Sequence, residues 1–121
     1  MDKGKLKEKS FKFAVRVVNL YKYLCEEKKE FVLSKQILRS GTSLGAMIRE
    51  AEHAESKSDF IHKMAIAQKE CNETIYWLEL LQTTDYISNT EFESINPNAI
   101  EIIKMITSSI KTTKKSLTTN H

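Results

Sequence analysis

The feature that most constrains this chain is an uninterrupted apolar row between residues 59 and 83. Its members alternate steps of four and three along the chain: Phe60, Met64, Ala67, Cys71, Thr74, Leu78 and Leu81. A row with this spacing lies along one side of an α-helix and is typical of helices that pack nearly parallel to each other. The sequence therefore predicts a long helix here, capped at its start by Ser56 or Ser58, in a protein built of packed helices.

Three more segments show helical periodicity, and little in the chain interrupts them. One proline and three glycines in 121 residues favour long helices over sheets with many turns. We expect the four helices at about 6–27, 32–55, 58–83 and 97–117. The last should begin at Asn96-Pro97, a capping residue followed by proline, after a short separate turn over 89–94. Short connections between such helices predict an all-α, up-down-up-down four-helix bundle that spans 1–121 as one domain.

The first helix carries two apolar stripes instead of one. The first stripe consists of Phe11, Ala14, Val15, Val18, Tyr21 and Cys25, and the second of Phe13, Val17, Leu20 and Leu24. Together they cover more than half of the helix circumference, which is more than one bundle core requires. We therefore expect a second buried contact on this helix.

The second helix has two glycines inside its inward row. That row consists of Leu33, Ile37, Gly41, Leu44, Ile48 and Ala51, and Gly45 also falls within it. A glycine in a helix interior costs about 1 kcal/mol relative to alanine, so we expect a neighbouring backbone to approach closely at Gly41 and Gly45. The alternative is a break at Ser40-Gly41. The apolar phase continues across both glycines, and this favours one continuous helix.

No residue pattern predicts an active site. Glu50 with His53 and Asp59 with His62 have the spacing of di-metal bundle ligands, but all four lie around one loop and outside the inward rows. The two cysteines, Cys25 and Cys71, fall on apolar positions, and no histidine shares their faces to activate a thiolate. We expect no catalytic residues, no cofactor and no metal, and we keep a metal-dependent bundle enzyme as the weaker alternative.

A stripe of charged and aromatic residues runs along the flanks of helices two and three. It contains Arg39, Ser43, Ala46 and Glu50 on the second helix, and Ile66, Glu70, Glu73 and Trp77 on the third. Arginine and aromatic residues are enriched in protein interfaces. The pattern predicts an oligomer interface made by Arg39, Ser43, Glu50, Glu70, Glu73 and Trp77. A salt-bridge network inside one chain, with Trp77 at the edge of the core, explains it equally well.

Positive charge gathers at the start of the chain. Residues 1–30 contain nine Lys and Arg against five Asp and Glu, whereas the whole chain has a net charge of +3. Any attraction to the phosphates of RNA or DNA would begin there. The candidate residues are Lys3, Lys5, Lys7, Lys9, Lys12 and Arg16. The alternative is a flexible, solvated lysine tail that binds nothing.

The chain has no sign of export or membrane insertion. No stretch approaches the roughly 20 apolar residues that a spanning helix needs, and the first residues lack the apolar block of a signal peptide. The two cysteines fit buried thiols in a reducing compartment better than a disulfide framework. We expect a cytoplasmic protein with no membrane partner.

One run of residues resembles a known family. The run 36–46, QILRSGTSLGA, is followed by Glu50-Ala51, Asp59-Phe60, Lys69-Glu70, Glu73-Thr74 and Tyr76-Trp77-Leu78. In order and spacing, from about residue 8 to 115, this resembles the 23S rRNA intervening-sequence proteins, whose superfamily includes the accessory variability protein of diversity-generating retroelements. The family often has an asparagine where this chain has Met47, which puts a polar role at that position in doubt.

The resemblance implies a helical bundle that assembles into a ring-shaped homopentamer and has no known catalytic activity. It also implies partners, because the retroelement relative binds nucleic acid and a reverse transcriptase. From the residues and the resemblance together we expect a non-enzymatic, homo-oligomeric interaction protein that binds nucleic acid backbone non-specifically. A protein scaffold that binds no nucleic acid remains the alternative.

Overall fold

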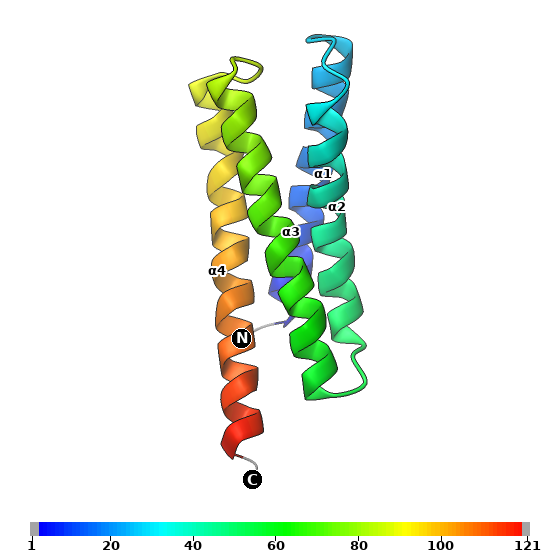
Figure 1. The fold of residues 1–121 in the computed structure, drawn as a ribbon, viewed down its shortest axis with the longest axis vertical. Helices are drawn as coiled ribbons and strands as arrows, with labels where there is room; N and C mark the ends of the chain where they lie inside the picture. Colours follow the sequence, from blue (N-terminus) through cyan, green and yellow to red (C-terminus); the bar gives the residue numbers. More distant parts are fainter. Residues whose placement is uncertain (1–2, 120–121) are drawn as a thin grey trace.

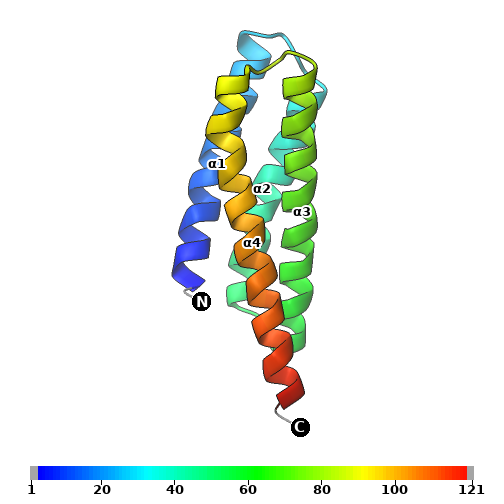
Figure 2. The same cartoon turned by 90° about the vertical axis from the view of Figure 1, so that its left-hand side faces the viewer.

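The computed structural model describes residues 3–119, which form an antiparallel bundle of four helices without any strand. The helices are α1 (Lys3–Glu26), α2 (Leu33–Glu52), α3 (Lys57–Thr83) and α4 (Asn89–Thr119). Successive helices run in opposite directions, and α4 returns beside α1 (Figures 1 and 2). The all-α, up-down-up-down bundle predicted from the sequence is therefore confirmed. None of the four described helices combines the length and the apolar character that a bilayer crossing needs.

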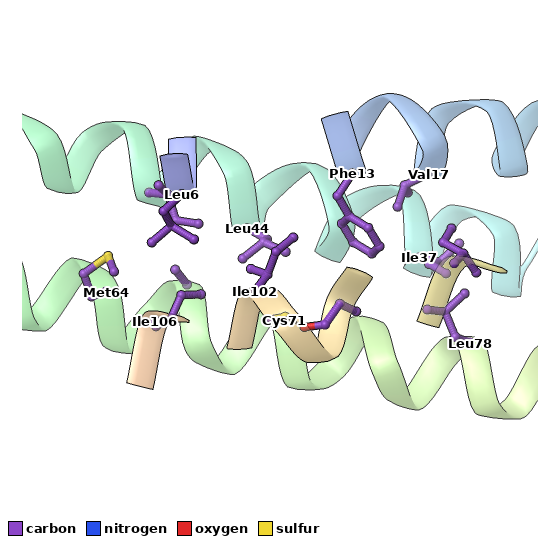
Figure 3. Close-up of a cluster of buried hydrophobic side chains, with 14 of the residues drawn as sticks. Leu6, Phe13, Val17, Ile37, Leu44, Met64, Cys71, Leu78, Ile102 and Ile106 are labelled. Atoms are coloured by element: carbon purple, nitrogen blue, oxygen red, sulfur yellow. Dashed lines mark hydrogen bonds between the residues drawn. The ribbon is translucent and has the colours of Figure 1, made fainter. Parts of the chain in front are cut away.

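The core lies along the bundle axis and takes side chains from every helix. The row predicted for α3 is buried at Met64, Ala67, Cys71, Thr74, Leu78 and Leu81, and Phe60 packs at its edge. Figure 3 shows Phe13 and Val17 of α1 meeting side chains of the other three helices, among them Leu44, Cys71 and Ile102. Residues of α4 contribute Ile95, Ala99, Ile102, Ile106 and Ile110. Ile102 is buried at 1% exposure, whereas its neighbour Ile103 is only partly buried.

The helix α2 is continuous, and its two glycines differ. Neither has a positive φ, so the predicted alternative of a break at Ser40-Gly41 is wrong. A Cβ added at Gly41 would lie 2.8 Å from both γ-carbons of Val17 in α1, whereas one at Gly45 would meet the Ser10 carbonyl oxygen at an ordinary 3.5 Å. The close neighbour at Gly41 is therefore a side chain and not the expected backbone, whereas at Gly45 a backbone does lie beside the glycine, but only at ordinary contact distance.

A buried carboxylate organises the connection between α1 and α2. Lys29 adopts a positive φ of 53°, and the next residue, Glu30, is only 8% exposed. The Glu30 carboxylate accepts hydrogen bonds from the first backbone N–H groups of α2, at 3.1 Å from Val32, 3.0 Å from Leu33 and 2.7 Å from Ser34. Burial alone raises the pKa of Glu30, but these donors outweigh it and hold the pKa below the usual 4.5.

The helix ends elsewhere are also capped by side chains. Ser56 Oγ accepts the N–H of Asp59 at 3.0 Å, so Ser56 and not Ser58 caps α3. Ser88 and Glu91 form a reciprocal capping box at the start of α4, with distances of 2.7 and 3.1 Å.

The predicted start of the fourth helix at Asn96-Pro97 is wrong. The helix α4 begins at Asn89 and runs through Pro97. Proline removes one backbone donor, but Pro97 and the Glu93 four residues before it are both exposed, so the freed carbonyl faces solvent. Ile95 on the same turns is buried in the core, and this packing holds the segment helical. Tertiary contact thus overrides a strong local start signal.

Candidate interaction site

The first apolar stripe of α1 is only partly covered by the rest of the described chain. We call Phe11, Ala14, Val15, Val18, Tyr21 and Cys25 the outer stripe, and none of its members is buried. Phe11 is 58% exposed and Val15 45%, whereas Phe13 and Val17 of the second stripe are 1% and 0% exposed. The nearest cover over Phe11 is the Arg49 guanidinium of α2, 5.7 Å from the ring centre. Cys25, predicted as a buried thiol, is only half-buried.

Exposed apolar surface is concentrated on one half of the molecule. The large apolar side chains that are exposed in residues 3–119 are Phe11, Val15, Phe31, Val32 and Tyr76. Four of these five belong to α1 or to the connection into α2, and only Tyr76 lies on α3. Scattered apolar residues are normal on a soluble surface, but a cluster on one side is typical of an interaction surface.

The stripe predicted as an oligomer interface makes contacts within the chain. The Arg39 guanidinium pairs with Glu70, Nη1 to Oε2 at 2.8 Å, and with Glu73, which also accepts the Trp77 indole N–H at 3.1 Å. The Trp77 bond, followed by the Arg39 charge, holds the pKa of Glu73 below its usual value. Ser43 is half-buried, and Glu50 is exposed and lies 3.9 Å from Lys63 Nζ. These contacts explain the pattern inside one chain, and its role between chains stays a prediction.

The lysines predicted as a flexible tail belong to α1. The helix begins at Lys3, whose side chain lies outside the described part of the chain, and Leu6 is buried in the core at 3% exposure. The picture of a solvated tail is therefore wrong for residues 3–9, because the tertiary contact of Leu6 fixes the segment. Lys5 is exposed.

The remaining basic residues of α1 point in different directions. Lys7 pairs with Glu52 of α2 at 3.4 Å, Lys9 with Glu101 of α4 at 3.1 Å, and Lys12 with Glu8 at 2.8 Å. Arg16 donates to the carbonyl and the hydroxyl of Ser94 in α4, at 2.8 Å each. The structure thus spreads the predicted nucleic-acid residues around the helix instead of gathering them on one face.

Sequence reasoning missed a second basic segment at the end of α4. Residues 102–119 contain Lys104, Lys111, Lys114 and Lys115 and no acidic residue. The end of α4 and the start of α1 lie at the same end of the bundle (Figure 1). Residues 70–103 contain seven acidic residues and no Lys, Arg or His. A count of charged residues in shorter windows would have found the basic segment 102–119 and the acidic segment 70–103, because the net charge of the whole chain averages over them.

The residues predicted as weaker candidates for metal binding lie around the connection between α2 and α3. Asp59 Oδ2 accepts the N–H of Glu55, and Glu50 and Asp59 both face Lys63, at 3.9 and 3.7 Å. Across residues 3–119 no three His, Cys, Asp or Glu side chains, Glu50, His53, Asp59 and His62 included, are close enough to share a metal ion. Burial raises the pKa of the Cys71 thiol to about 12, and its S–H donates to the Ala99 carbonyl. Such a thiol is a core side chain and no nucleophile.

Comparisons with known proteins identify relatives of the whole bundle. The profile of the family described as 23S rRNA-intervening sequence protein matches residues 3–108. A crystal structure of a protein of unknown function from the S23 ribosomal protein family of Bacteroides thetaiotaomicron is 61% identical in sequence, with a TM-score of 0.90. The match covers 92% of this chain and 99% of that one. No functionally curated protein is similar enough to count as a match.

Proposed function

The chain belongs to the family of 23S rRNA-intervening sequence proteins, and from this premise we propose that it is a homo-oligomeric, non-enzymatic interaction protein. The observation that carries the proposal is the outer stripe of α1. Phe11 and Val15 lie four residues apart on one face of α1 and expose apolar surface that contact with a partner would remove from water. Burying such a surface against another subunit removes it from water, as a stable homo-oligomer interface does.

The other apolar rows and the charged stripe find their contacts within one chain. The apolar rows of α2, α3 and α4 pack together in one core. In the charged stripe, Arg39 of α2 forms ion pairs with Glu70 and Glu73 of α3. The outer stripe is a helix face on which Phe11 and Val15 stay exposed, so assembly is the function that we propose from the geometry. We place the assembly in the cytoplasm, where free thiols such as Cys25 and Cys71 persist.

Light scattering coupled to size exclusion tests this proposal. At micromolar concentration the mass should be a multiple of the 14.0 kDa subunit, and a pentamer would give about 70 kDa. Dilution over two decades should shift the mass toward the monomer only at the lowest concentrations, since an obligate apolar interface is tight. A mass of 14.0 kDa at every concentration would refute the proposal.

A second function, binding to the phosphate backbone of RNA or DNA, is supported by the lysines of α4. Lys111 and Lys114 are exposed in the last third of α4, in a stretch that has no acidic residue. Phosphate binding by lysines is insensitive to base sequence, and it weakens with salt because counterions are released. An assembly would multiply the weak contacts of each subunit through effective concentration.

Fluorescence anisotropy with a labelled single-stranded RNA and a DNA duplex at several salt concentrations measures this activity. Replacing Lys111 and Lys114 by glutamate should lower the affinity by at least about tenfold and flatten the salt slope. The matched control is Lys69→Glu, an exposed lysine in the middle of α3. Absent binding at low salt, or an equal loss in the control, would leave a protein scaffold as the better account.

A further inference from the structure

A groove lies between α1 and the first turns of α4, near the end of the bundle that holds the connections 27–32 and 84–88 (Figure 2). Its volume is about 490 Å³, which is within the usual range of small-molecule sites. The apolar side chains that line it are packed into the core or against its edge: Leu20, Tyr23, Ile87 and Ile95. The packing of the bundle therefore holds this apolar lining in place for a ligand.

Two opposite charges line the same groove, Arg16 of α1 and Glu91 of α4. The Arg16 guanidinium donates to the carbonyl and the hydroxyl of Ser94 at 2.8 Å each, and Glu91 Oε1 accepts the N–H of Ser88 at 2.7 Å. Neither side chain forms an ion pair with any residue of 3–119. Neutral partners thus hold the two charges in place without neutralising them.

Both charged groups keep the capacity to bind a ligand. A guanidinium has more N–H donors than Ser94 takes up, and a carboxylate has more acceptor sites than the Ser88 N–H uses. Arginine pairs with carboxylates through two parallel hydrogen bonds, which fix the orientation of the bound group. The groove therefore offers one site for a carboxylate and one for a cation beside an apolar lining.

A ligand with a single charge fits this groove poorly. An apolar anion would pair with Arg16 but would also meet the Glu91 carboxylate, and an apolar amine would pair with Glu91 but would meet the guanidinium. An uncharged molecule would shield both groups from water without giving them a partner. A molecule with both charges at one end and an apolar body at the other avoids all three costs.

We propose that the groove binds a free α-amino acid with an apolar side chain. The carboxylate of the amino acid pairs with the Arg16 guanidinium, its ammonium group pairs with the Glu91 carboxylate, and its side chain contacts Leu20, Ile87 and Ile95.

This site is separate from the outer stripe. Arg16 contacts Ser94 of α4, whereas Phe11 lies under Arg49 of α2, so the groove and the outer stripe occupy different sides of α1. Binding of an amino acid therefore does not require the proposed homo-oligomer, and the two proposals can fail independently.

Amide NMR spectra of the isotope-labelled protein measure the binding, with L-phenylalanine as the probe. Two analogues each lack one charge, because hydrocinnamate has no ammonium group and phenethylamine has no carboxylate. Phenylalanine should cause saturable shifts at groove amides such as those of Leu20, Ile87 and Ile95. It should bind at least about tenfold more tightly than either analogue, because each analogue leaves one charge of the groove without a partner.

Two variants assign the two charges, Arg16→Gln and Glu91→Gln. Glutamine at position 91 can still accept the Ser88 N–H as part of the capping box. Arg16→Gln should make phenylalanine bind no more tightly than phenethylamine, and Glu91→Gln should make it bind no more tightly than hydrocinnamate. The matched control is Lys9→Gln, which removes a cation of α1 that pairs with Glu101 of α4 outside the groove. This control should bind all three probes as the wild type does, and circular dichroism checks that every variant is folded.

Four results would overturn the proposal. The first is the absence of saturable shifts up to the solubility limit of phenylalanine, and the second is a set of shifts that lie away from the groove. The third is equal binding of phenylalanine and the two analogues by the wild type. The fourth is an equal loss of binding in Lys9→Gln and the two groove variants, because the cause would then be the net charge of the protein and not the groove.

Discussion

The helices α1 and α3 lie diagonally across the bundle and differ in how much of their apolar surface the chain covers. The apolar row of α3 is a single seam, and it is buried from Met64 to Leu81. The helix α1 has one stripe that is buried equally well, at Phe13 and Val17, and one that the chain leaves exposed, at Phe11 and Val15. Four helices around one axis can enclose one stripe from each. A second apolar stripe on α1 therefore lies outside this core.

The largest expected effect comes from comparing a buried and an exposed phenylalanine on α1. Phe13→Ala should lower the free energy of unfolding by about 3–5 kcal/mol, because it empties a fully buried site. Phe11→Ala should change it by no more than about 0.5 kcal/mol, because that ring is already in water. Urea denaturation at sub-micromolar concentration, followed by the fluorescence of Trp77, measures both. Equal losses would mean that the outer stripe supports the subunit fold after all.

The two glycines of α2 sharpen the comparison, because they show how tightly the buried stripe of α1 is packed. Gly41→Ala should cost about 1–3 kcal/mol, since the new methyl group would sit 2.8 Å from the stiff side chain of Val17. Gly45→Ala should be neutral or stabilise by up to about 1 kcal/mol, because its contact is ordinary and alanine favours a helix.

A double-mutant cycle with Val17→Ala completes the glycine experiment. The cost of Gly41→Ala should shrink when Val17 is shortened, and that of Gly45→Ala should not change. If Gly41→Ala raises the melting temperature in the wild-type background, α1 and α2 are less closely packed than the structure indicates.

Acidic residues of different burial accept backbone N–H groups at the starts of α2 and α3. Glu30→Gln, at the exit of α1, should lower stability by about 1–2 kcal/mol, because the buried backbone donors of α2 lose a charged acceptor. Asp59→Asn, at the start of α3, removes a charge from a partly exposed position and should cost less.

The pKa of Glu30 gives this prediction a pH dependence. Its pKa is lower in the folded protein than the usual 4.5, so its stabilisation is fully present above about pH 4.5 and is lost as the pH falls through the folded value. The difference in stability between wild type and Glu30→Gln should therefore shrink on acidification below pH 4.5. A difference that stays constant from pH 7 to pH 3 would contradict the assigned cause.

The smallest expected difference is in the reactivity of the two thiols, Cys25 on the outer stripe of α1 and Cys71 in the buried row of α3. Cys25 is half-buried and should react with a thiol reagent such as dithiobisnitrobenzoate in the native protein. Cys71 is 0% exposed with a pKa of about 12, so it should react only after unfolding. One thiol per subunit released in buffer and two in denaturant is the expected count. Fast reaction of both would place the seam of α3 in contact with solvent.

The sequence by itself determined the fold class, and for a physical reason. The spacing of apolar residues fixes which side of each helix must leave water, and this predicted the rows of α2 and α3 and the two stripes of α1. It also predicted the family through the run 36–46 and the residues that follow it, and that family is confirmed over residues 3–108. Periodicity could not rank the two stripes, because both have the same spacing and similar side chains.

The tertiary structure decided what depends on neighbours far away in the sequence. Phe13 and Val17 are buried in the core, whereas Phe11 is exposed. Gly41 lies against the Val17 side chain, and Gly45 makes only an ordinary contact. The helix α4 continues through Pro97. The structure also shows that Lys7, Lys9 and Arg16 are held by α2 and α4 instead of forming one basic face. A glycine in a helix costs about 1 kcal/mol and a proline about 3 kcal/mol, whereas each large apolar side chain that is buried contributes about 1.5–3 kcal/mol, so the packing of several side chains outweighs one local preference.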